Sequence, residues 1–169
     1  MKQSSYELLK KFTNKFSGSV AWRVKKHCKI IDMHLNPNET INFIFAGQLD
    51  IKPLSLFNTG VIAVTSERLI IAQKKLIVGY KFSSITPDLY NDLTVKSGII
   101  WGTIMIDTVR EQVYISDLDK EALPEIETEI TMFMQEAKKN VILRVFRTAH
   151  CPPGKYFFGV TCSALSVLL

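Results

Sequence analysis

Two short apolar runs around a polar turn constrain this chain more than any other feature. They lie at residues 61–64 and 69–72, are rich in Val and Ile, and are separated by Thr65-Ser66-Glu67-Arg68. Apolar runs of this length, bounded by turn residues, are typical of hairpin strands that are buried on both faces. We therefore predict that residues 60–72 form a hairpin at the centre of an antiparallel sheet.

Strand-like segments continue on both sides of this hairpin. Apolar alternation and β-branched residues recur between turns such as Ser97-Gly98 and Arg110-Glu111. The predicted strands are residues 41–48, 60–65, 69–72, 76–82, 93–95, 99–108 and 112–116. Seven short strands with a turn every several residues indicate an all-β sandwich or barrel.

Two helices are predicted before the strands, and we interpret residues 1–38 as a helical arm. Ser4 and Glu7 fit a capping box, and apolar residues then recur at helical spacing until Gly18. A second helix is predicted from about Ser19, with Cys28 in its apolar stripe. Its basic residues lie mostly outside that stripe; they are Arg23, Lys25, Lys26 and Lys29. Packing against the sheet is the simpler role for this arm, and a basic surface for a membrane or a partner is the alternative.

An amphipathic helix is predicted after the last strand, capped by Asp117 or Asp119 and regular from near Leu123. Its apolar stripe consists of Leu123, Ile126, Ile130, Phe133 and Ala137. The tail, residues 141–169, is less clear. Residues 142–146 fit either more helix or a strand, and residues 156–169 are apolar but shorter than the ~20 residues that span a bilayer. An anchor, a packed element and a segment without a settled fold all remain open, and we favour packing.

Charge and cysteine content narrow the class of protein. The net charge is +5, and the basic excess lies in residues 1–40 and 141–169. Such an excess favours anionic lipid, nucleic acid or an acidic protein face. Nucleic acid ranks last among these partners, because the basic residues lack interleaved aromatic residues on a strand platform. The three distant cysteines and the absence of a signal peptide favour a cytoplasmic protein with free thiols.

The sequence carries no recognisable catalytic motif. Glycine-rich phosphate loops, Gly-x-Ser-x-Gly and His-Glu-x-x-His do not occur. His27, His34 and His150 are far apart and lack metal-ligand spacing. We therefore expect no enzyme activity, no catalytic or metal residues and no cofactor, and we identify no small-molecule substrate.

Seven antiparallel strands followed by one amphipathic helix resemble the pleckstrin-homology (PH)-like domains. The local sequence is similar to a bacterial group called YokE-like, and Thr-x-x-Arg-Leu at residues 65–69 recurs in related GRAM-type domains. The matching segments are residues 35–39, 60–71, 98–104 and the helix from Leu123. The resemblance covers about residues 36–138 and implies an α+β, mainly β fold: a seven-stranded bent barrel at residues 39–140, capped by the C-terminal helix. The helical arm at 1–38 and the tail at 141–169 are predicted from the residues themselves.

The resemblance does not extend to the best-known ligand of PH domains. Phosphoinositide-binding members share a basic cluster across the first two strands, whereas residues 41–48 and 60–65 contain no Lys or Arg. Lys52 stands alone in the connecting loop. A candidate anionic-ligand patch is Lys74, Lys75 and Lys81, although ordinary exposed turn lysines are the simpler interpretation. We expect Arg68 to pair with Glu67 or another nearby carboxylate.

The leading functional hypothesis is a cytosolic protein-interaction module, including self-association through an exposed strand edge. Trp101 and Tyr90 are candidates for an exposed aromatic contact, although such residues are more often in the core. The alternative is a peripheral membrane module that uses the basic arm and the apolar tail to bind anionic lipid.

Overall fold

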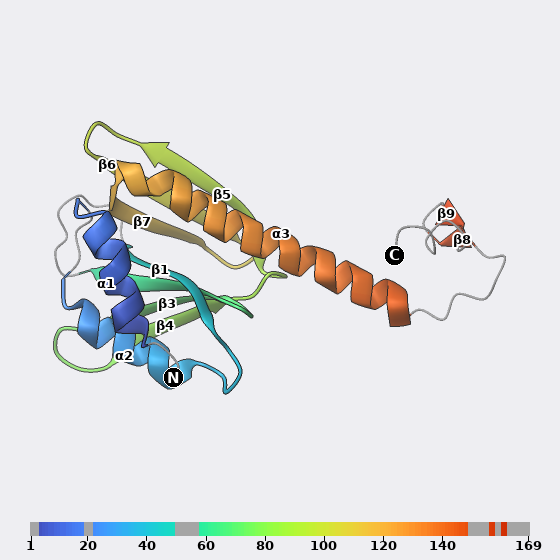
Figure 1. Ribbon diagram of the computed structural model, residues 1–169, viewed down its shortest axis with the longest axis horizontal. Helices are drawn as coiled ribbons and strands as arrows, with labels where there is room; N and C mark the ends of the chain where they lie inside the picture. Colours follow the sequence, from blue (N-terminus) through green and yellow to red (C-terminus); the bar gives the residue numbers. More distant parts are fainter. Residues whose placement is uncertain (1–3, 19–21, 50–57, 149–155, 158–159, 162–169) are drawn as a thin grey trace. The chain divides into compact units, whose positions relative to one another are not determined.

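Seven antiparallel strands form one curled sheet (Figure 1). They are β1 (Ile41–Gln48), β2 (Thr59–Thr65), β3 (Leu69–Lys74), β4 (Tyr80–Ile85), β5 (Tyr90–Ser97), β6 (Trp101–Thr108) and β7 (Gln112–Asp119). Their order in the sheet is β4-β3-β2-β1-β7-β6-β5. Because β4 and β5 are the two ends of this order, the sheet is an open half-barrel. The predicted fold, a bent seven-stranded barrel with helices before and after it, is confirmed.

This computed structural model describes residues 4–18, 22–49, 58–148, 156–157 and 160–161. The chain divides into two compact units, Met1–Ala137 and Lys138–Leu169. The sheet and the two N-terminal helices all belong to the first unit.

The N-terminal helices cover one face of the sheet (Figure 1). Helix α1 (Ser5–Lys15) packs on β1, and helix α2 (Val24–His34) packs on β2 and β3. The ring of Phe12 meets Phe43 edge-on at 5.5 Å, and Cys28 is buried. Every residue of β2 is buried, because α2 covers one face and the half-barrel interior covers the other. The predicted burial of the central hairpin on both faces is thus confirmed.

Helix α3 (Leu123–Thr148) follows the last strand and a short 3-10 turn, η1 (Lys120–Ala122). Asp119 caps that turn by accepting from the Glu121 amide, whereas Asp117 lies at φ 56° and caps nothing. The predicted apolar stripe is buried as far as Ile130, and Met134 rather than Phe133 is its next fully buried member. This helix face therefore contributes Leu123, Ile126, Ile130 and Met134 to the core.

An ion pair fixes the turn between β2 and β3 to the end of α2. The Arg68 guanidinium donates to both carboxylate oxygens of Glu39, at 2.9 Å each, and to the His34 carbonyl oxygen at 2.8 Å. Glu39 also accepts from the Thr65 hydroxyl and from the Asn36 amide. Arg68 thus pairs with Glu39, one of the nearby carboxylates that the sequence left open.

A close backbone crossing explains one glycine. Gly47 lies where β1 crosses β7, and a Cβ there would come within 2.6 Å of Ile115 Cγ2. Only a residue without a side chain allows β1 to approach β7 this closely.

Several predicted element boundaries are wrong. Helix α2 begins at Val24 instead of near Ser19, because Arg23 takes a left-handed conformation at φ 58°. Strand β4 begins at Tyr80 instead of Leu76, and β6 begins at Trp101 instead of Ile99. In both strands the apolar residues placed at the start belong to the preceding turn.

The C-terminal segment is only partly described. Residues 142–146 extend α3, which settles the choice between helix and strand. Strands β8 (Tyr156–Phe157) and β9 (Val160–Thr161) pair with each other as a short antiparallel ladder. The other expectations for the tail, and the one for Lys52, lie outside the described residues. Within the part of the chain that is described, no helix is both long and apolar enough to span a bilayer.

Candidate functional site

The four basic residues predicted on the arm gather at the start of α2. Arg23, Lys25, Lys26 and Lys29 line one shallow hollow. Lys25 and Lys29 also border a second hollow that contains the carboxylates of Glu7 and Asp32. Arg23 and Lys26 line only the first hollow, which has no acidic residue in its lining.

The other predicted patch, Lys74, Lys75 and Lys81, is divided between two faces of the sheet. Lys81 pairs with Gln73, and Lys74 pairs with Tyr80. Neighbouring residues of a strand point to opposite faces, so Lys81 and Lys74 do not face the same ligand. Lys75 is exposed in the turn between β3 and β4. The three lysines thus do not converge as a single anion site.

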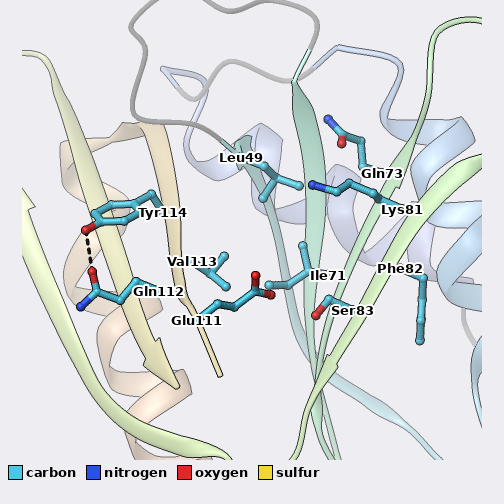
Figure 2. A pocket seen from close by; sticks show the side chains of 10 residues that line it. All are labelled: Leu49, Ile71, Gln73, Lys81, Phe82, Ser83, Glu111, Gln112, Val113 and Tyr114. Atoms are coloured by element: carbon cyan, nitrogen blue, oxygen red, sulfur yellow. Dashed lines mark hydrogen bonds between the residues drawn. The ribbon is translucent and has the colours of Figure 1, made fainter. Parts of the chain in front are cut away.

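Lys81 faces a cavity of about 390 Å³ between β3–β4 and the start of β7. Figure 2 shows Lys81 and Ser83 pointing toward this cavity, whereas Phe82 points away from it. Across from Lys81, Glu111 contributes a carboxylate, and Tyr114 donates to Gln112 at 2.9 Å. One cation facing one carboxylate offers little to a multiply charged anion, which needs several basic donors.

The turn between β3 and β4 carries a feature that the sequence interpretation missed. Leu76, Ile77 and Val78 are 51%, 92% and 79% exposed at its tip. The alternation of Leu76 and Val78 with Tyr80 and Phe82 is typical of a strand, which is why the sequence predicts one from residue 76. The signal that marks the tip is Gly79, whose φ of +83° ends the turn.

His27 fixes this turn to the start of α2. Its Nδ1 accepts from the Lys74 amide at 2.7 Å, so the ring proton is on Nε2, which lies 3.2 Å from the Trp22 carbonyl oxygen. Burial lowers the pKa of His27, and nearby Arg23 adds to this, while the bond to Trp22 opposes it. A neutral His27 therefore holds Trp22 beside the base of the β3–β4 turn.

A second apolar tip lies between β5 and β6. Ile99 and Ile100 are exposed, and the half-exposed Trp101 donates its indole N–H to the Gly18 carbonyl oxygen at 3.2 Å. Trp101 is therefore accessible, as expected for a candidate exposed aromatic contact. The other candidate, Tyr90, is only 8% exposed, so its proposed role as an exposed contact is wrong.

No catalytic constellation emerges in the described part of the chain. Its His, Cys, Asp and Glu residues form no group of three or more that could hold a metal ion. Burial raises the pKa of Cys28 to about 12, despite a hydrogen bond from Ser5, so its thiol is unreactive at neutral pH.

A curled seven-stranded half-barrel with a helix packed into its core defines the class of PH-like domains, which are generally binding modules. The family model described as "Bacterial PH domain" matches residues 35–132, more than half of the chain. The chain therefore belongs to the bacterial PH domain family. Its assignment to the YokE-like group stays a prediction.

Two solved structures are similar to the chain. One is a DUF1696 family protein with a pleckstrin-homology domain from Shewanella loihica PV-4: 11% identical, TM-score 0.46, covering 69% of this chain and 97% of that chain. The other is a pleckstrin homology domain from Shewanella amazonensis SB2B. It is 14% identical, has a TM-score of 0.45, and the match covers 73% of this chain and 98% of that chain. No protein with a curated description matches the chain.

Proposed function

We propose that this chain is a non-catalytic binding module that docks on an anionic membrane surface. The contact would be made by Arg23, Lys26, Lys74 and Lys75, which we call the basic face. One observation carries the proposal: Lys74 and Lys75 lead into an exposed apolar turn, His27 joins its base to the segment of Arg23 and Lys26, and neither segment holds an acidic residue. Residues 8–31 and 68–87 contain no Asp or Glu.

The chemistry of the basic face suits a charged interface. Each Lys or Arg close to an anionic membrane contributes about 1 kcal/mol, and the effect fades within a Debye length. Four such residues on two neighbouring elements therefore support measurable, salt-sensitive attachment. This surface differs from the arm and tail of the sequence hypothesis, because the β3–β4 turn takes the place of the tail.

Charge reversal on the basic face should abolish this attachment. We expect the wild-type protein to sediment with mixed phosphatidylcholine–phosphatidylserine vesicles at low salt, and not with phosphatidylcholine alone. The double variant Lys26→Glu/Lys75→Glu should bind at least about tenfold more weakly, since it replaces two attractive charges with two repulsive ones.

The matched control is Lys96→Glu/Lys120→Glu, on β5 and η1, which changes the net charge equally at two other exposed lysines. It should retain most of the vesicle binding. Equal loss in both double variants would mean that net charge alone matters, and no sedimentation of the wild-type protein would overturn the membrane proposal.

A second candidate function is self-association in the cytosol, as the sequence suggested. It is favoured by the terminal position of β5 in the sheet, because the outer edge of such a strand can accept another strand. Light scattering should then show an oligomer that forms as the protein concentration rises. A wild-type protein that stays monomeric at high concentration would exclude this candidate.

A further inference from the structure

The turn between β3 and β4 presents three aliphatic side chains on a closed, defined loop. The Lys75 amide donates to the Gly79 carbonyl oxygen at 3.2 Å, and Gly79 turns the chain back at its positive φ. Leu76, Ile77 and Val78 occupy the positions between them and point into solvent. Consecutive exposed aliphatic residues are unusual on a monomeric surface and indicate an interaction site.

The base of this turn is held against the start of α2. His27 bonds the Lys74 amide on one side and the Trp22 carbonyl on the other, so the turn and Trp22 share one edge of the molecule. The guanidinium of Arg23 lies 5.2 Å from the centre of the Trp22 ring. A half-exposed tryptophan beside cations is the arrangement found at the headgroup level of membranes.

The charges around the turn identify the occupant. Lys74 and Lys75 lead into the turn, and the hydrogen bond from the Lys74 amide to His27 joins the turn to the start of α2, which carries Arg23 and Lys26. An exposed apolar turn with cations on both joined segments, and no acidic residue in either segment, complements an anionic bilayer, whose charged headgroups overlie an apolar interior. A bilayer also needs no matching pocket, whereas a protein partner would have to provide a concave one.

We propose that Leu76, Ile77 and Val78 enter the boundary between headgroups and acyl chains of an anionic bilayer, with Trp22 at the headgroup level. The inference rests on the proposed function and deepens it. The basic face brings the protein to the membrane, and the tip adds an apolar contact that salt does not screen.

Two matched substitutions distinguish insertion of the β3–β4 tip from undirected hydrophobic adsorption of the protein to vesicles. Ile77 and Ile99 are each 92% exposed, so replacing either by Asp should leave the fold intact. Ile77→Asp should weaken binding to mixed phosphatidylcholine–phosphatidylserine vesicles at least about tenfold and remove the part that survives high salt. Ile99→Asp, on the other tip, should leave both quantities unchanged.

Insertion itself can be followed with an environment-sensitive fluorophore. Cys151→Ser and Cys162→Ser leave only Cys28, which is buried and unreactive, so Ile77→Cys or Ile99→Cys can be labelled selectively with nitrobenzoxadiazole. Vesicle addition should shift the emission to the blue and raise its intensity at position 77, and not at position 99.

The outcomes distinguish the two proposals. Salt-sensitive binding that Ile77→Asp leaves unchanged, with no emission shift at position 77, would overturn tip insertion while the proposed function stands. No vesicle binding by the wild-type protein would overturn both. Equal effects at positions 77 and 99 would show undirected hydrophobic adsorption and would also overturn tip insertion.

Discussion

Ile130→Asp unfolds the first unit of this protein instead of altering its binding. The Ile130 side chain is fully buried in the stripe that α3 contributes to the core. Removing a buried isoleucine side chain costs about 2–5 kcal/mol, and an unpaired buried carboxylate adds several more. The sum is comparable to the whole stability of a typical domain, about 5–15 kcal/mol. Circular dichroism and urea denaturation should show no cooperative transition, or one shifted to far lower urea.

Met132→Asp is the matched control on the same helix. Met132 is 55% exposed, two residues from Ile130. The substitution should cost under about 1 kcal/mol, mostly through the poorer helix propensity of Asp. A cooperative, near-wild-type transition for Ile130→Asp would contradict the position of α3 in the core.

Arg68→Met should destabilise the protein by about 3–5 kcal/mol, because it leaves a buried carboxylate without its counter-ion. Glu39 is fully buried, and the Arg68 side chain is 17% exposed, so water replaces little of the lost interaction. The substitution also removes the donor to the His34 carbonyl oxygen. Both losses weaken the contact between the end of α2 and the β2–β3 turn. Urea denaturation at neutral pH measures the effect.

The double variant Glu39→Gln/Arg68→Met provides the control, because it removes the Glu39 carboxylate together with its partner, the Arg68 guanidinium. It should be more stable than Arg68→Met alone, and the double-mutant cycle gives the coupling energy of the pair. A double variant as unstable as the sum of both single variants would mean that the two side chains act independently.

Acid should reduce the difference between wild type and Arg68→Met. Burial acts to raise the pKa of Glu39, but hydrogen bonds from Arg68, Asn36 and Thr65 and the charge of Arg68 outweigh it and lower the pKa to about 2. The wild type therefore keeps this stabilisation above the ordinary pKa of 4.5 and loses it as the pH falls toward 2. In Arg68→Met the carboxyl protonates more readily, so the variant loses less in acid. The same destabilisation at pH 7 and in acid would contradict this account.

Local sequence patterns predicted most of the architecture. The apolar runs at residues 61–64 and 69–72 form β2 and β3, and the helical spacing of Leu123, Ile126 and Ile130 identifies the buried face of α3. These predictions succeed because strand and helix periodicity determine which side chains share a face. Ser4 likewise caps α1 as its spacing from Glu7 predicts.

The candidate site was predictable only in its parts. Sequence singled out the basic residues of α2 and of the β3–β4 turn, but it could not tell that Lys74 and Lys81 face opposite sides. Nor could it bring the β3–β4 turn to α2, since the bond between His27 and Lys74 joins residues 47 positions apart.

The sequence alone determined the class of fold, because periodicity is local. Only the tertiary structure decided which apolar residues remain outside. Leu76 and Val78 continue the alternation of β4, yet a turn that ends at Gly79 leaves them exposed. Exposure depends on which distant elements cover a residue, and α2 covers the sheet but stops short of this tip. That geometry exposes three aliphatic side chains directly after Lys74 and Lys75, at a turn that His27 joins to α2.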